Sequence, residues 1–135
     1  MKNFETGEKL IGEAEEYYLD LLQAYKRRSW NTVARRAQEV VELSLKGLLK
    51  MMGIEYPKIH DVGWLLEKIV LEKGVEAKKE TIKEIKEISA SLARDRSPAF
   101  YMETTYSKLQ AEKAKRQAER VLSWAREMTG KLKEK

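Results

Sequence analysis

The sequence contains no cysteine, one histidine and only two prolines among its 135 residues. Without cysteine there are no disulfides and no thiolate metal sites, and a single histidine cannot complete a soft metal site, so we expect neither a structural metal nor a cofactor. Two prolines and seven glycines are too few turn-forming residues for an all-β fold. No apolar run reaches the roughly 18 residues of a membrane span, and residues 1–10 show no secretory signal. We therefore expect a cytoplasmic protein with no membrane contact.

Charge is abundant but unevenly distributed. The net charge is +5, yet residues 1–25 hold six acids and two bases, whereas residues 26–50 hold seven bases and two acids. A basic surface attracts phosphates, RNA or acidic proteins, although a solvated, lysine-rich face explains the same composition. The abundance of Lys, Glu and Arg also favours a thermophilic source. One basic cluster is suited either to a nucleic-acid backbone or to the acidic first helix of another subunit; it comprises Lys26, Arg27, Arg28, Arg35 and Arg36.

Hydrophobic residues recur at helical spacing in five stretches and predict an all-α fold. The expected helices cover residues 8–25, 30–52, 61–73, 79–94 and 107–128. Short connections favour an antiparallel, up-and-down bundle of about five helices, forming a single domain over residues 1–135 with its core in roughly 10–128. The second helix has an apolar face wider than one stripe, so we place it at the centre of the bundle.

Particular residues predict where these helices begin and end. Ser29 and Asp61 are expected N-caps, and Ser107 has the spacing of a capping box with the residue three positions on. Gly74 is suited to a left-handed C-cap. Pro98 lacks a backbone N–H, so we expect the fourth helix to end before it.

A row of polar side chains lies among the aliphatic residues of the second helix. Gln38, Glu42 and Lys46 are four residues apart, which places them on one helix face with Glu before Lys in the better orientation for an ion pair. The row is either a solvated, stabilising pair or a polar surface that faces a cleft or a second subunit.

Four sequence segments, taken in their order along the chain, resemble the HEPN domain family. The resemblance covers roughly residues 10 to 128, and it rests on the stretch 37–49 that contains the polar row, on His60-Asp61 at the start of the third helix, on Ala93-Arg94 before a proline, and on Leu122-Ser123-Trp124. It implies a homodimer and a partner nucleotidyltransferase of the polymerase-β type, in some cases as a toxin–antitoxin pair.

The resemblance also implies an RNA-cleaving motif in some members, an Arg followed by four to six residues and a His. From Arg94 that His would fall at 99–101, where the sequence has Ala99, Phe100 and Tyr101, and Arg96 has none either. The only histidine, His60, is in another connection, where we expect it to hydrogen-bond to backbone. We therefore expect no catalytic residues and no metal.

What remains is a non-catalytic module in which Arg94, Arg96 and Tyr101 bind nucleotide or RNA, since guanidinium groups grip phosphate and aromatic rings stack on bases. The arginines could instead pair with acids while the aromatics anchor the loop. Two other hypotheses stay open: a divergent metal-independent ribonuclease that uses Arg94 with Tyr101 or a displaced His60, and a purely structural adaptor.

Overall fold

The computed structural model describes residues 2–102 and 105–134, and this part of the chain contains five helices and no strand. The helices are α1 (Lys2–Lys26), α2 (Trp30–Met51), α3 (Gly63–Lys73), α4 (Lys79–Phe100) and α5 (Lys108–Lys133). The predicted all-α bundle is confirmed.

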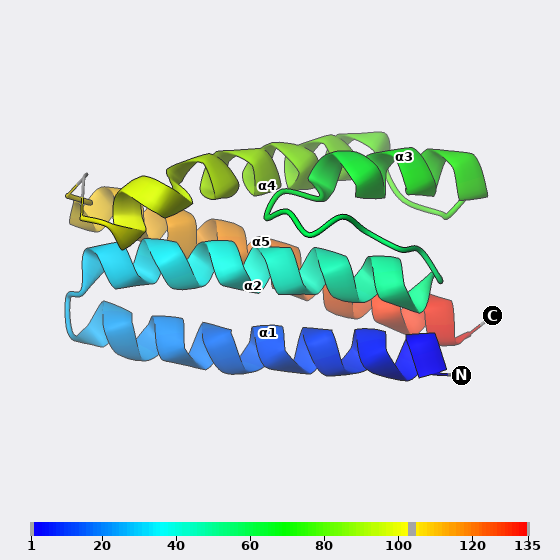
Figure 1. Ribbon diagram of the computed structural model, residues 1–135, viewed down its shortest axis with the longest axis horizontal. Helices are drawn as coiled ribbons and strands as arrows, with labels where there is room; N and C mark the ends of the chain where they lie inside the picture. Colours follow the sequence, from blue (N-terminus) through cyan, green and yellow to red (C-terminus); the bar gives the residue numbers. More distant parts are fainter. Residues whose placement is uncertain (1, 103–104, 135) are drawn as a thin grey trace.

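Helix α2 lies at the centre of the molecule (Figure 1). It runs antiparallel to α1, packs against α5 on a second side and against α4 on a third, and also contacts α3. Twelve of its residues are buried, which accounts for its wide apolar face. The predicted central position is therefore confirmed.

Helices α1 and α2 approach each other closely because glycines face each other across the interface. A Cβ atom added to Gly47 would lie 2.8 Å from the carbonyl oxygen of Gly7 and 2.6 Å from Cγ1 of Ile11. A side chain at this position would force the two backbones apart. These glycines therefore determine how closely the acidic helix α1 packs against α2.

The helix ends agree with the sequence at two of the four predicted caps. Ser107 begins a complete capping box with Gln110, and Gly74 has a φ of 63° in a left-handed cap, as predicted. Ser29 occupies the cap of α2, but its hydroxyl donates to Oγ1 of Thr32 instead of accepting a backbone N–H. The prediction for Asp61 was one residue early, because Val62 holds the cap position.

Asp61 still organises the start of α3. Its Oδ1 atom accepts the backbone N–H of Gly63 at 3.1 Å and the hydroxyl of the buried Ser89 at 2.8 Å. An aspartate side chain that accepts from two residues onward makes an Asx turn, which satisfies a free amide just as a cap does. The second bond fixes α3 on α4.

The prediction that α4 ends before Pro98 was wrong. The helix continues through Pro98 to Phe100, and the N–H of Tyr101 reaches the carbonyl oxygen of Ser97 at 3.0 Å. Pro98 leaves the carbonyl of Arg94 without its helical donor, but this loss falls in the last turn, where few further bonds depend on it. The longer α4 carries Arg94, Arg96 and Phe100 on regular helix.

The connection between α2 and α3, residues 52–62, doubles back along α2 before α3 begins (Figure 1). It thereby carries His60 to the middle of α2, next to the polar row. In the described residues, no helix is both long and apolar enough to cross a lipid bilayer.

Candidate functional site

The polar row of α2 is half-buried and joined by hydrogen bonds. Nζ of Lys46 donates to Oε2 of Glu42 at 2.7 Å, and Nε2 of Gln38 donates to Oε1 of Glu42 at 2.9 Å. Gln38 is only 2% exposed, so it needs these partners to offset the cost of losing water. The row is thus a connected polar layer inside the bundle as well as an ion pair.

Arg96 extends this layer from α2 to α4. Its guanidinium donates to Oε1 of Gln38 at 2.7 Å and lies 3.7 Å from Oε2 of Glu39. Glu39 also pairs with Arg36 at 2.7 Å. Arg96 is therefore engaged by groups of its own chain, and it connects the two helices that carry the predicted site residues.

His60 reaches the same layer from the 52–62 connection. Its Nδ1 atom lies 2.8 Å from Oε1 of Glu42, a side-chain partner, so the expected hydrogen bond to backbone was wrong. An ionised carboxylate can only accept, so Nδ1 carries the proton and Nε2 remains the basic nitrogen of the neutral ring. The side chain of His60 is 54% exposed.

Glu42 is the acceptor on which these contacts converge. Burial acts to raise the pKa of Glu42, but hydrogen bonds from Gln38, Lys46 and His60, with the charge of Lys46, outweigh it and lower the pKa. The carboxylate therefore stays ionised at neutral pH and holds the imidazole in one orientation. This is an arrangement in which a histidine can exchange protons from a fixed position.

His60 and Arg96 open into one cavity of about 220 Å³. Its remaining lining is mostly acidic or aromatic and comes from α1 and α2: Glu13, Tyr17, Glu39, Glu42 and Leu43. Lys46 and Arg36 pair with two of these carboxylates. A positively charged group and an imidazole that are far apart in the sequence thus share one polar pocket.

Arg94 and Tyr101 lie elsewhere, on the outer face of α4. Arg94 precedes Arg96 by two residues, a rotation of about 200° around the helix, so the two guanidinium groups leave α4 on opposite sides. Tyr101 follows Arg94 by seven residues and returns to the same face. Arg94 is exposed, and Tyr101 is 66% exposed. Helical spacing thus favours one exposed face for Arg94 and Tyr101, whereas Arg96 lies inside the polar layer.

Three segments meet at this end of the bundle. Asn31, at the start of α2, donates to the carbonyl of Ala99 in α4 at 3.3 Å and accepts the backbone N–H of Tyr106, just before α5, at 2.9 Å. Beside it, the guanidinium of Arg35 stacks 4.4 Å from the ring centre of Phe100. These contacts bring the basic α1–α2 turn next to the aromatic end of α4.

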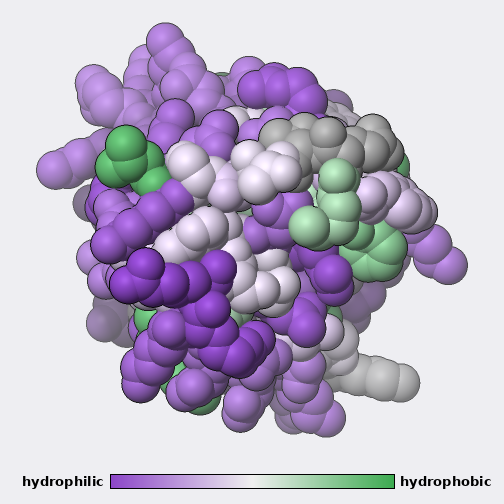
Figure 2. All heavy atoms as spheres, turned by 90° about the vertical axis from the view of Figure 1, so that its left-hand side faces the viewer, coloured by the Kyte–Doolittle hydropathy of each residue, from purple (hydrophilic) through white to green (hydrophobic). Residues whose placement is uncertain are grey.

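Figure 2 looks onto this end of the molecule. Weakly polar and apolar side chains gather in the middle of the view, and strongly hydrophilic residues surround them. Phe100, Tyr101 and Met102 are 45%, 66% and 67% exposed, and Arg27 and Arg28 are exposed in the neighbouring turn. We call the exposed residues at this end of the bundle the basic-aromatic end; they are Arg27 and Arg28 in the α1–α2 turn, Phe100 and Tyr101 at the end of α4, and Arg94 on the preceding turns of α4.

Sequence reasoning did not place His60 and Glu39 with the predicted residues. The i, i+4 spacing identified the row on α2, but the contact with His60 depends on the path of the 52–62 connection, which has no periodic pattern to predict it. Across the described ranges 2–102 and 105–134, no three His, Asp or Glu side chains come together as a metal-binding group.

The model of the HEPN domain family matches residues 8–128, almost the whole chain. The protein therefore belongs to the HEPN domain family, as its motifs indicated. Membership of this family supports a role related to nucleotides or RNA in general. No curated protein and no solved structure matches the chain.

Proposed function

We propose that the protein is a non-catalytic HEPN module that binds nucleotide or RNA phosphate at its basic-aromatic end. The observation that carries the proposal is that Arg94 and Tyr101, near the C-terminal end of α4, are exposed at the same end of the bundle as the exposed Arg27 and Arg28 (Figure 1). An exposed guanidinium can grip a phosphate with two hydrogen bonds, and an exposed ring next to it can stack on a base. Arg96 takes a supporting role, since it fixes α4 on α2 behind this surface.

Binding of a single-stranded RNA oligonucleotide, followed by fluorescence anisotropy at several salt concentrations, tests this function. Removal of one phosphate contact by Arg94→Ala should weaken binding and reduce the slope of log affinity against log salt by about 0.7. Tyr101→Ala should weaken binding through loss of one stacked base, by about 1–3 kcal/mol, and leave the salt slope unchanged.

Arg126→Ala is the matched control. It removes an exposed arginine from α5 that pairs with Glu15 on α1, away from the basic-aromatic end. Equal loss of affinity in Arg126→Ala and Arg94→Ala would show that only overall charge attracts RNA, and unchanged binding in both Arg94→Ala and Tyr101→Ala would remove the assigned surface.

We also propose that the chain forms a homodimer and pairs with a nucleotidyltransferase, in the manner of a toxin–antitoxin pair. Family membership supports the proposal, because HEPN domains are often dimeric. The neighbouring reading frame tests it: a small nucleotidyltransferase encoded there and co-expressed should elute with this chain as a stoichiometric complex. Separate elution of the two proteins would contradict the pairing, and light scattering at the monomer mass would contradict the dimer.

A second candidate function is a metal-independent ribonuclease centred on His60. One observation favours it: His60 and Arg96 open into the same cavity, with Glu42 holding the imidazole. Nε2 of His60 is then placed to accept a proton from a ribose 2′-hydroxyl, and Arg96 to stabilise charge on the phosphate. The three carboxylates of the cavity oppose this function, because they repel a phosphate.

Incubation of structured RNA with the protein and a chelator, at about pH 6 to 9, separates the two functions. A ribonuclease would cleave, and His60→Ala would abolish cleavage while leaving RNA binding intact. Absence of cleavage, with binding that depends on Arg94, is the result that the non-catalytic function predicts.

A further inference from the structure

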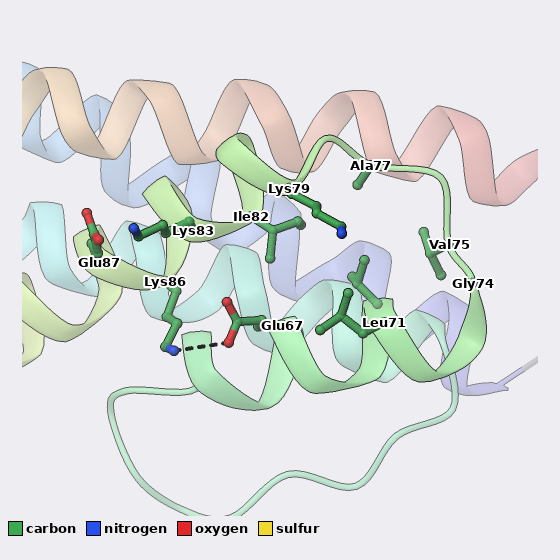
Figure 3. A pocket seen from close by; sticks show the side chains of 11 residues that line it. Glu67, Leu71, Gly74, Val75, Ala77, Lys79, Ile82, Lys83, Lys86 and Glu87 are labelled. Carbon is green, nitrogen blue, oxygen red and sulfur yellow. Dashed lines mark hydrogen bonds and ion pairs between the residues drawn. The ribbon is translucent and has the colours of Figure 1, made fainter.

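A second, larger concavity lies between α3 and α4 (Figure 3). These two helices lie on the side of the molecule away from α1 (Figure 1). Its volume is about 600 Å³, within the range of roughly 300 to 1,000 Å³ that small-molecule sites occupy. Of the eleven residues that line it, five are charged and five are aliphatic, namely Val70, Leu71, Val75, Ala77 and Ile82. Leu71 is 63% exposed, so a large apolar side chain at the rim remains in water.

The charges around this groove are asymmetric. Lys86 donates to Glu67 at 3.0 Å, so these two neutralise each other at one end. Lys83 points along α4 toward Glu87, whereas the side chain of Lys79 extends over the groove between Ile82 and Ala77 (Figure 3). Among the described residues Lys79 has no ion-pair partner. The groove is therefore apolar along its length and cationic at the Lys79 end.

We propose that this groove binds a small amphipathic anion, a compound with a medium-length alkyl chain and one carboxylate group. The apolar body lies along Val70, Leu71 and Ile82, where its burial is the main source of affinity. The carboxylate faces Lys79, whose ammonium extends over the groove. Aliphatic side chains that lie together, with charged groups around them to orient a ligand, are a pattern of small-molecule sites.

Isothermal titration of the full chain with decanoate, octanoate and decanol tests both parts of the site. Decanoate should bind with one saturable site, and octanoate roughly tenfold more weakly, because two buried methylenes are lost. Decanol has the same apolar chain without the charge, so it should bind more weakly than decanoate.

Charge reversal on α4 supplies the matched comparison. Lys79→Glu should weaken decanoate roughly tenfold and leave decanol unchanged, because attraction becomes repulsion at the head. Lys83→Glu, one turn further along the same helix, should change decanoate binding far less, since its side chain lies along α4 toward Glu87, one turn away from Lys79. Leu71→Glu should remove decanoate binding, and Leu109→Glu, at an exposed leucine on α5, should not.

Equal effects of Lys79→Glu and Lys83→Glu, or equal binding of decanoate and decanol, would overturn the anion-binding assignment. No saturable decanoate binding would overturn the site as a whole. Loss of self-association in Leu71→Glu, with decanoate affinity unchanged, would identify the groove as a contact between copies of the chain and would likewise overturn the proposal. None of these results depends on RNA binding at the basic-aromatic end.

Discussion

Nδ1 of His60 lies 2.8 Å from Oε1 of Glu42, although the two residues are 18 positions apart. The contact holds the 52–62 connection against the middle of α2. It also makes Glu42 the common acceptor of groups from α2 itself and from the connection. The stability of this region should therefore depend on the ionisation of one carboxylate.

Acid should weaken the fold through Glu42. Its pKa is lowered from the ordinary value of 4.5, so its contribution is present above about pH 4.5 and is lost as the pH falls through the lowered value. Glu42→Gln should destabilise the protein by about 1–3 kcal/mol near neutral pH, because it leaves Lys46 without its counter-charge. Urea unfolding at several pH values should show the gap between variant and wild type narrowing in acid.

His60→Ala serves as the companion variant for this measurement. The imidazole is 54% exposed, so its loss should cost only about 0.2–1 kcal/mol. A constant gap between Glu42→Gln and wild type down to pH values well below 4.5 would contradict the ionisation argument.

Arg94 and Arg96 should differ sharply in their effect on stability. Arg96→Ala removes the guanidinium that donates to Oε1 of Gln38, a side chain that is 2% exposed. The free energy of unfolding should fall by about 1–3 kcal/mol. Arg94→Ala, at an exposed position, should stay within about 0.5 kcal/mol of wild type. A double-mutant cycle of Arg96→Ala with Gln38→Ala should give a coupling energy above about 0.5 kcal/mol. Additive single effects would show that the bond contributes nothing.

The contrast between these arginines also shows how far the sequence could predict the site. Helical spacing identified the row of Gln38, Glu42 and Lys46, because its members lie on one element and follow one period. It could not show that Arg96 on α4 completes the row, since the register of α4 against α2 is set by packing between distant segments. The contact of His60 with Glu42 could not be predicted for the same reason.

More of the fold than of the site could be predicted, and the error at Pro98 has a local cause. Hydrophobic periodicity reports burial directly, so the five helices and the central place of α2 followed from it. Pro98 was expected to end α4, but a proline in the last turn removes only one bond, and packing of Ala99 and Phe100 against α2 compensates.

The glycine contact between α1 and α2 predicts opposite outcomes for two identical substitutions. Gly47→Ala would place Cβ 2.8 Å from the carbonyl oxygen of Gly7 and should destabilise the protein by about 1–3 kcal/mol. Gly12→Ala meets nothing within 4 Å and should stabilise α1 by up to about 1 kcal/mol. Chemical denaturation of both variants checks the prediction. Stabilisation by Gly47→Ala would show that the helices can separate without loss of packing.

Alkaline pH should weaken the bundle through two tyrosines. Burial, together with Glu119 near Tyr18 and Asp95 near Tyr106, raises the pKa of each from 10.0 to about 12. The folded state therefore holds these protons more tightly than the unfolded chain, and the resulting stability is present below pH 10 and lost as the pH rises through about 12.

Phenylalanine at both positions should reduce this alkaline loss, because Phe has no proton to release. The double variant Tyr18→Phe/Tyr106→Phe should start less stable at neutral pH, since it lacks the hydrogen bonds to Glu119 and Asp95, and its unfolding free energy should then fall less between about pH 10 and 12. Tyr101→Phe removes an exposed hydroxyl with no hydrogen bond among the described residues, and it is the matched control. Parallel curves of unfolding free energy against alkaline pH for wild type and the double variant would contradict the prediction. Tyr18 and Tyr106 would then release their protons equally easily from the folded and the unfolded chain, and other groups would cause the loss of stability.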